Sequence, residues 1–191
     1  MALSPEDQRY LLTLARQTIT RALEGQDLPE VDLSTLSEAL RRPGASFVTL
    51  TLDGELRGCI GSIEPRRPLV LDVQENAIAA AFHDPRFPPL SRRELDRIHI
   101  EISVLTVPQL LEYKGPADLL AKLRPEVDGV IIERGWHRAT FLPQVWEKLP
   151  DPHEFMAHLC LKAGLPVDDY CRPGLQVYTY QVEKFEEEPA K

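Results

Sequence analysis

The sequence predicts a fold in which helices alternate with antiparallel β-hairpins along one chain. Two turn signals carry this prediction, because Asp53-Gly54 and Arg134-Gly135 each separate runs rich in apolar and β-branched residues. Each hairpin is followed by a proline-containing loop and a helix, over 47–83 and over 129–163. Residue identities do not repeat between these two segments, so the pattern indicates at most a structural duplication.

The first helix is expected to begin directly after Ser4. Ser4 is a preferred N-cap residue, Pro5 is favoured in the first helical turn, and two acidic residues follow. Apolar residues then lie on one stripe until Gly25, a residue type that commonly ends helices. A second, short helix over 35–41 is expected to stop before Pro43-Gly44, just ahead of the first hairpin.

The middle of the chain predicts a helix over 69–82, a stiff loop over 83–90 and a strand over 98–104. Three prolines make the loop too stiff for a flexible linker. Ser91 and Glu94 form a capping box, which predicts a short helix between the loop and the strand.

The last third of the chain predicts a helix over 117–123, the second hairpin, a helix that begins at Asp151 and a strand over 175–185. Cys160 falls on the apolar stripe of the last helix, so we expect it to pack rather than react. The acidic tail over 186–191 is expected to fray.

Size and composition restrict the class of protein. A length of 191 residues with 43% hydrophobic residues suits one compact domain over 1–191, or one domain with a smaller lobe. A net charge of −8 argues against a general nucleic-acid-binding protein, since such proteins cluster Lys and Arg. The chain has no apolar run near the ~20 residues that a membrane span needs, and its N-terminus lacks the features of a signal peptide. We therefore expect a cytoplasmic protein that binds neither membranes nor nucleic acid.

The sequence predicts no metal and no cofactor. Its three cysteines form no C-x-x-C pair, which favours reduced thiols over disulfides or a zinc site. His153 and His158 suggest a zinc motif, but at their spacing two rings on a regular helix point about 140° apart. Glycine-rich nucleotide-binding motifs and the serine-hydrolase motif are absent from the sequence.

The most informative feature is a lone cysteine between two glycines, in the segment Leu56-Arg57-Gly58-Cys59-Ile60-Gly61. If the preceding turn fixes the register, Leu50 lies opposite Arg57 and Val48 lies opposite Cys59. Arg57 and Cys59 then project from the same face, roughly 6–7 Å apart. At this distance a guanidinium favours the thiolate form of a cysteine that is partly shielded from water.

The surroundings of Cys59 allow two interpretations. Gly58 and Gly61 leave room for a substrate or a second backbone segment to approach the sulfur. Alternatively, Cys59 is a small apolar side chain packed under a helix, and the glycines serve a bulge. In either case we expect the proline-rich loop over 83–90 to double back along the preceding helix and face the cysteine strand.

Further motifs follow the cysteine segment in a fixed order. They are Asp84-Pro85-Arg86-Phe87-Pro88-Pro89-Leu90, Ile100-Glu101-Ile102-Ser103-Val104-Leu105, Ala139-Thr140-Phe141-Leu142-Pro143-Gln144-Val145-Trp146 and Leu159-Cys160-Leu161-Lys162-Ala163-Gly164-Leu165. Together they resemble the AMMECR family, called AmmeMemoRadiSam system protein A in bacteria and archaea, over nearly the whole chain. The resemblance implies an α+β fold of two β/α repeats that share one barrel-like, mainly antiparallel sheet with flanking helices. It also implies the company of a Memo-like protein and a radical S-adenosylmethionine enzyme, and it implies no settled activity.

We infer from these motif positions a thiol-dependent enzyme or carrier that acts on a small substrate, anionic if an arginine binds it. The catalytic residues would be Cys59 as the nucleophile, Arg57 as the activating charge and Glu101 for proton transfer. The expected substrate-binding residues are Gly58, Gly61, His83, Asp84, Arg86, Phe87 and Thr140.

A second hypothesis is an adapter module that binds the same partners without catalysis. Phe87, Leu90 and Trp146 would then be apolar anchors, and Arg86 would be a polar one. The ordinary alternative for Phe87 and Trp146 is a place in the hydrophobic core.

Overall fold

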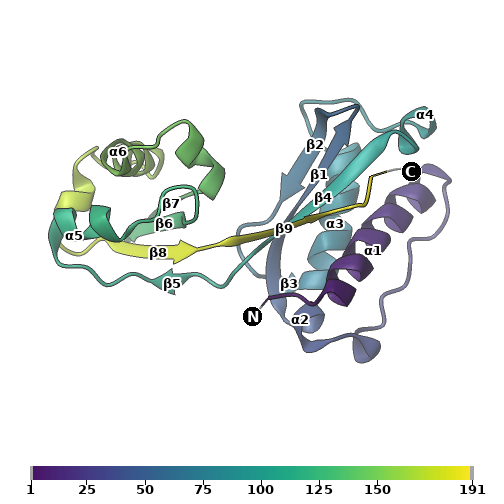
Figure 1. The fold of residues 1–191 in the computed structure, drawn as a ribbon, viewed down its shortest axis with the longest axis horizontal. Coiled ribbons are helices and arrows are strands. Elements are labelled where there is room, and N and C mark those ends of the chain that lie inside the picture. The colour runs from purple at the N-terminus through teal and green to yellow at the C-terminus, as the bar shows by residue number, and fades with distance from the viewer. Residues whose placement is uncertain (1, 190–191) are drawn as a thin grey trace. The chain divides into compact units, whose positions relative to one another are not determined.

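The structure is a computed structural model that describes residues 2–189. The chain forms two compact units, the first made of residues 2–105 and 183–189 and the second of residues 106–182 (Figure 1). Each unit has its own hydrophobic core. Whether the two units behave as one domain, as expected over 1–191, stays a prediction.

Unit 1 combines helices with an antiparallel sheet. Its elements are α1 (Pro5–Leu23), the 3-10 turn η1 (Leu33–Thr35), α2 (Glu38–Arg41), β1 (Pro43–Leu52), β2 (Glu55–Gly61), β3 (Arg67–Pro68), α3 (Leu69–Phe82), α4 (Arg92–Leu95), β4 (Ile98–Leu105) and β9 (Val182–Glu186). The strand order is β2-β1-β4-β9, and β3 pairs with the start of β1. Strand β1 runs antiparallel to both of its neighbours, β2 and β4. The short helix expected over 35–41 begins later, at Glu38.

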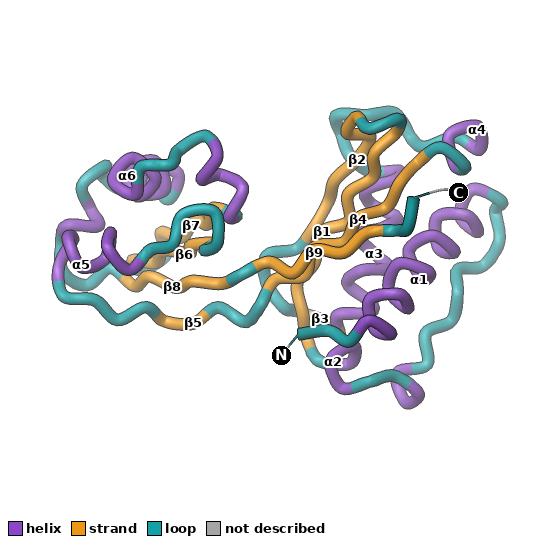
Figure 2. The backbone as a smooth tube through the Cα atoms, viewed as in Figure 1, coloured by secondary structure: helices purple, strands orange, loops and turns teal. Residues whose placement is uncertain are grey.

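Two long helices cover the core face of this sheet. Figure 2 shows α1 and α3 beside the strands, and their buried stripes pack against residues such as Leu50 and Ile100 in one cluster. The Ser4 hydroxyl accepts a 3.0 Å hydrogen bond from the Asp7 amide, so α1 begins as predicted. Helix α3 spans the predicted residues. None of the helices described over 2–189 is long and apolar enough to cross a membrane.

A bulge in β2 changes the predicted hairpin register. Leu50 pairs with Gly58 and Thr49 pairs with Cys59, while Arg57 is the additional residue at the shift. The prediction that placed Cys59 opposite Val48 is therefore wrong by one residue. Because neighbouring side chains alternate between the two faces, Cys59 lies on the face opposite the helical core.

The bulge has a packing cause at Gly58. A Cβ atom at this position would lie 2.1 Å from the carbonyl oxygen of Ala80 in α3. Strand and helix are thus in direct backbone contact, and only glycine permits this approach. The contact fixes which residue of β2 faces the helix.

Unit 2 has its own four-stranded sheet, in the order β5-β8-β6-β7. Its elements are β5 (Gln109–Leu110), α5 (Gly115–Lys122), β6 (Gly129–Arg134), β7 (His137–Phe141), the 3-10 turn η2 (Pro143–Glu147), α6 (Pro152–Lys162), the 3-10 turn η3 (Asp169–Cys171) and β8 (Gln176–Tyr180). Trp146 is buried and stacks on Phe155 with ring centres 3.7 Å apart. Its indole nitrogen donates a 2.7 Å hydrogen bond to the Asp128 carbonyl, which satisfies its polar group inside the core.

The fold is α+β, but the expected single barrel-like sheet is replaced by two separate open sheets in the described chain. The strand predicted over 175–185 divides at Gln181 into β8 and β9, which pair in different sheets. Gln181 instead exchanges hydrogen bonds with Thr106, donating to its hydroxyl and accepting from its amide. Residues of one continuous alternating sequence pattern therefore pair in two different sheets.

The start of the acidic tail is held in unit 1. Glu186 is part of β9, and the Glu187 carboxylate accepts two hydrogen bonds from Arg16, of 2.8 and 2.7 Å. Both residues therefore have partners in unit 1, and the fraying expected over 186–191 stays a prediction. Residues 190–191 lie outside the described residues.

We predict that Gly58→Ala lowers the free energy of unfolding by at least ~1–3 kcal/mol, the usual cost of overpacking a core. The new methyl group must displace the α3 backbone at Ala80. Urea unfolding followed by circular dichroism measures the effect. The exposed neighbour Glu55→Ala is the control and should stay within about 0.5 kcal/mol of wild type. Equal stability of both variants would contradict the close approach.

Candidate functional site

Cys59, Thr49 and Glu101 form a row across three neighbouring strands. Thr49 in β1 pairs with Cys59 of β2 on one side and with Glu101 of β4 on the other. All three residues are partly exposed and lie on the sheet face opposite the helices. The Thr49 hydroxyl lies 3.2 Å from the Cys59 sulfur, within hydrogen-bonding distance. The thiol therefore has a polar partner and access to solvent.

An ion pair from the proline-rich loop supports the Cys59 backbone. The Cys59 amide donates a 3.0 Å hydrogen bond to the Asp84 carboxylate, and the Cys59 carbonyl accepts a 3.3 Å hydrogen bond from Arg86. Asp84 and Arg86 are themselves paired at 2.8 Å. Since β2 is an edge strand, these two side chains bind the peptide groups that an additional strand would otherwise pair. The expected meeting of the loop and the cysteine strand is confirmed.

The charges of this pair support each other. The Asp84 side chain is only 2% exposed, and the hydrogen bond from Arg86 holds its pKa well below the usual range of a carboxyl group. The hydrogen bond to Asp84 in turn raises the pKa of Arg86. The Arg86 side chain is 55% exposed, so the guanidinium beside Cys59 also faces solvent.

Arg57 does not have the predicted role beside the thiol. It is the bulge residue, it is 7% exposed, and its guanidinium donates a 2.8 Å hydrogen bond to Glu94. A second 2.8 Å hydrogen bond goes to the Pro88 carbonyl. The charge of Arg57 is thus matched by Glu94, whose pKa the Arg57 hydrogen bond lowers to about 2. Arg57 holds the loop and α4 against β2, while Arg86 is the arginine bonded to Cys59.

Other parts of the protein occupy the space beside the two glycines that flank Cys59. Beside Gly58 lies the Ala80 carbonyl, and a Cβ atom at Gly61 would lie 2.3 Å from the ring of Phe47. This packing, rather than room for a substrate, accounts for both residues.

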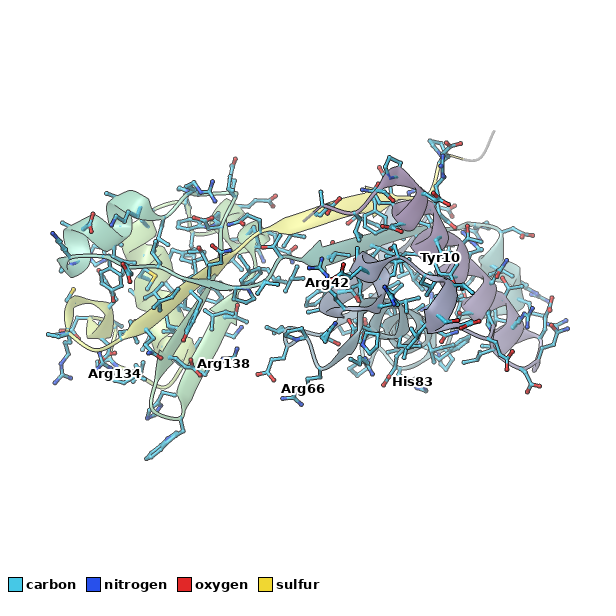
Figure 3. The ribbon with its side chains drawn as sticks, turned by 90° about the horizontal axis from the view of Figure 1, so that it is seen from below. Tyr10, Arg42, Arg66, His83, Arg134 and Arg138 are labelled. Atoms are coloured by element: carbon cyan, nitrogen blue, oxygen red, sulfur yellow. The ribbon has the colours of Figure 1, made fainter. Side chains whose placement is uncertain are left out.

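The other predicted binding residues are spread more widely. His83 is exposed at the end of α3 and is labelled in Figure 3, and Phe87 lies 5.4 Å from the Arg86 guanidinium and 5.9 Å from that of Arg57. Thr140 belongs to unit 2, where its hydroxyl lies 3.0 Å from that of Tyr180.

Two anchors expected for an adapter surface are core residues. Leu90 is 4% exposed and Trp146 is 1% exposed, so neither can contact a partner in the folded chain. Leu90 packs in the hydrophobic core of unit 1, and Trp146 packs in that of unit 2.

Sequence reasoning missed Thr49 and a buried polar cluster around Asp72. The Asp72 carboxylate, 1% exposed, accepts hydrogen bonds from the amide and hydroxyl of Ser46, and from Arg67 and Asn76. The alternation Thr49-Leu50-Thr51 could have placed Thr49 on the Cys59 face, had the bulge been recognised. Within residues 2–189, no three His, Cys, Asp or Glu side chains lie together as potential metal ligands.

The chain is similar to known proteins along nearly its whole length. The sequence model of the AMMECR1 family matches residues 12–185. A protein of Methanothermobacter thermautotrophicus is 44% identical over 190 residues, covering 97% of both chains, and one of Methanocaldococcus jannaschii is 40% identical, covering 97% and 92%. The crystal structure of an uncharacterised protein from Pyrococcus horikoshii superimposes with a TM-score of 0.79 at 38% identity, covering 97% and 94%.

We predict that Glu94→Gln lowers the free energy of unfolding at pH 7 by roughly 1.5–3 kcal/mol, because Arg57 loses a charged partner. The pKa of Glu94 is lowered from 4.5 to about 2 in the folded protein. Its stabilising charge is therefore complete above pH 4.5 and disappears as the pH falls toward 2.

Urea unfolding at pH 7, 4 and 3 measures this difference between wild type and variant. The difference should shrink as the pH falls, while Glu55→Gln, an exposed residue on β2, should show no such trend. A difference that stays constant down to pH 3 would show that the Glu94 charge is not the source of stability.

Proposed function

The chain belongs to the AMMECR1 family, and we propose that its activity depends on the thiol of Cys59, as the nucleophile of an enzyme or carrier for a small substrate. The observation that carries the proposal is the 3.2 Å contact between the Thr49 hydroxyl and the Cys59 sulfur on a partly exposed sheet face. The hydroxyl gives the sulfur a polar partner at the point where a substrate can reach it, which suits a cysteine nucleophile.

The row of side chains suggests the chemistry. The thiolate attacks an electrophilic carbon of the substrate, a sulfur–carbon bond forms, and the leaving group departs with the electrons of the bond that breaks. Glu101 receives the thiol proton through water. Because Thr49 separates Cys59 from Glu101 in the pairing, a small molecule lying over Thr49 would contact both.

Arg86 supports a substrate with an anionic group. Its side chain is half exposed, beside the Cys59 carbonyl, and its fork geometry suits a carboxylate or phosphate. The buried Asp84 holds the guanidinium in place. Partner proteins, by the resemblance of the motifs, would be a Memo-like protein and a radical S-adenosylmethionine enzyme. The three free cysteines agree with a reducing, cytoplasmic location.

The competing function is an adapter without catalysis. One observation favours it: Trp136, at the turn between β6 and β7, is 90% exposed, and Trp is enriched among residues that anchor protein interfaces. A native protein in which Cys59 resists alkylation at every moderate pH would support this function instead.

We predict that Thr49→Val slows alkylation of Cys59 by iodoacetamide at pH 7 by about threefold to tenfold, because the thiolate loses a hydrogen bond. The measurement uses a Cys171→Ser background, because Cys171 is exposed whereas Cys160 is buried. Mass spectrometry at a series of pH values gives the rate and its midpoint. Thr51→Val, two residues along the same strand face, is the control and should alkylate like wild type. Equal rates for both valine variants would remove Thr49 from the site.

We predict opposite effects for the two members of the loop ion pair. Asp84→Asn leaves the positive charge of Arg86 unmatched and should speed Cys59 alkylation near neutral pH. Arg86→Gln leaves the Asp84 carboxylate beside the Cys59 amide and should slow it. Circular dichroism checks that each variant is folded. Changes in the same direction would mean that disrupted packing, rather than charge, controls the thiol.

A further inference from the structure

Unit 2 contains a cleft that the Cys59 site does not use. The cleft has a volume of about 570 Å³, within the range that holds a drug-sized ligand. One wall comes from the chain between β5 and the start of α5, residues 110–113 and 115. The other is η3 with the segment that leads into β8, residues 170–177. All of the lining residues belong to unit 2.

Arg134 fixes the shape of the second wall. It comes from the end of β6 and is labelled in Figure 3. Its guanidinium forms a 2.7 Å ion pair with the buried Asp169 and donates a 3.0 Å hydrogen bond to the Pro173 carbonyl. The Tyr113 hydroxyl joins the two walls by a 3.2 Å hydrogen bond to the Leu175 carbonyl. Contacts within unit 2 therefore fix the positions of both walls.

The lining offers mostly apolar surface. Tyr113 and Tyr170 both line the cleft, but their hydroxyls are already bonded, that of Tyr170 to His153 at 2.5 Å. Burial raises the pKa of Tyr170 to about 12 and also raises that of Tyr113, so both rings stay neutral. Leu110, 53% exposed, adds an apolar side chain. Such a surface suits a flat, apolar ligand.

The charges of the lining restrict the ligand further. Arg172 is its one cation among the described residues, with a side chain 68% exposed. The nearest carboxylate oxygen of Asp169 is 3.9 Å away, beyond hydrogen-bonding distance, and Asp169 is already paired with Arg134. Arg172 thus has donors available for an anion. Glu112, which also lines the cleft, would repel a ligand with several negative charges.

We propose that this cleft binds a flat, mainly apolar small molecule that carries a single negative charge. The ring of the half-buried Tyr113 and the side chain of Leu110 would cover its apolar part, and Arg172 would bind its anionic group. This is a second binding site, independent of the chemistry proposed for Cys59.

The probe for the test is 8-anilinonaphthalene-1-sulfonate, an aromatic monoanion whose fluorescence rises in apolar surroundings. Titrated into the full chain carrying Cys59→Ser, it should bind at one saturable site. Arg172→Gln should weaken binding by roughly threefold to tenfold, the effect of losing one partly exposed charge partner. The control Arg66→Gln, with a side chain 81% exposed in unit 1, should bind like the parent chain.

A neutral probe separates charge from shape. N-phenyl-1-naphthylamine lacks the sulfonate, so Arg172→Gln should leave its affinity unchanged. Glu112→Gln should tighten binding of the sulfonate probe, because it removes a repulsive charge. Equal weakening of both probes by Arg172→Gln would contradict the assignment of Arg172 to the anion.

Protection of Cys171 locates the bound probe. Cys171 is exposed and lines the cleft, whereas Cys160 is buried. Saturating sulfonate probe should slow iodoacetamide modification of Cys171 in the Cys59→Ser chain by at least about threefold. Absence of saturable binding, or binding that leaves Cys171 fully reactive, would overturn the proposal. Because Cys59 is absent from the tested chain, either result is independent of the function proposed above.

Discussion

The cysteine site depends on how the edge of β2 is closed. A sheet edge presents unpaired amide and carbonyl groups, which are satisfied by a partner strand, by water or by side chains. At Cys59 the partner is the Asp84–Arg86 pair, in which a carboxylate accepts from the amide and a guanidinium donates to the carbonyl. This arrangement stops the sheet at β2 and fixes the backbone of Cys59, whose side chain lies on the face opposite the helices. The same hydrogen bonds thus close the edge of the sheet and fix the position of the residue that carries the thiol.

Two arginines near Cys59 have different roles because their surroundings differ. Arg57 is buried, faces Glu94 and closes the gap between β2, the proline-rich loop and α4. Arg86 lies on the loop surface and shares its charge between Asp84 and solvent. Sequence distance alone favours Arg57, which is two residues from the cysteine. The bulge removes that advantage, since it turns Arg57 into an unpaired residue of the strand.

Local signals in the sequence were sufficient for most elements and insufficient for their assembly. Helix α3 and the Ser91–Glu94 capping box follow from periodicity and cap chemistry, which act within a few residues. The β2 bulge depends on contact between Gly58 and Ala80, two residues far apart in the chain, so no local pattern reports it. The division at Gln181 could not be predicted for a similar reason. A strand with alternating apolar and polar residues has the same sequence pattern whether it pairs in one sheet or in two.

The division of the chain between the units has a consequence for synthesis on the ribosome. Unit 1 takes its last strand, β9, from the far end of the sequence, after all of unit 2 has been made. Strand β4 therefore waits without its outer neighbour while residues 106–182 are translated, a delay of several seconds at ordinary elongation rates of about 5–20 residues per second. During this interval Arg16 also lacks its partner Glu187. Unit 2 can finish folding first, so the order of completion is the reverse of the order in which the two units begin.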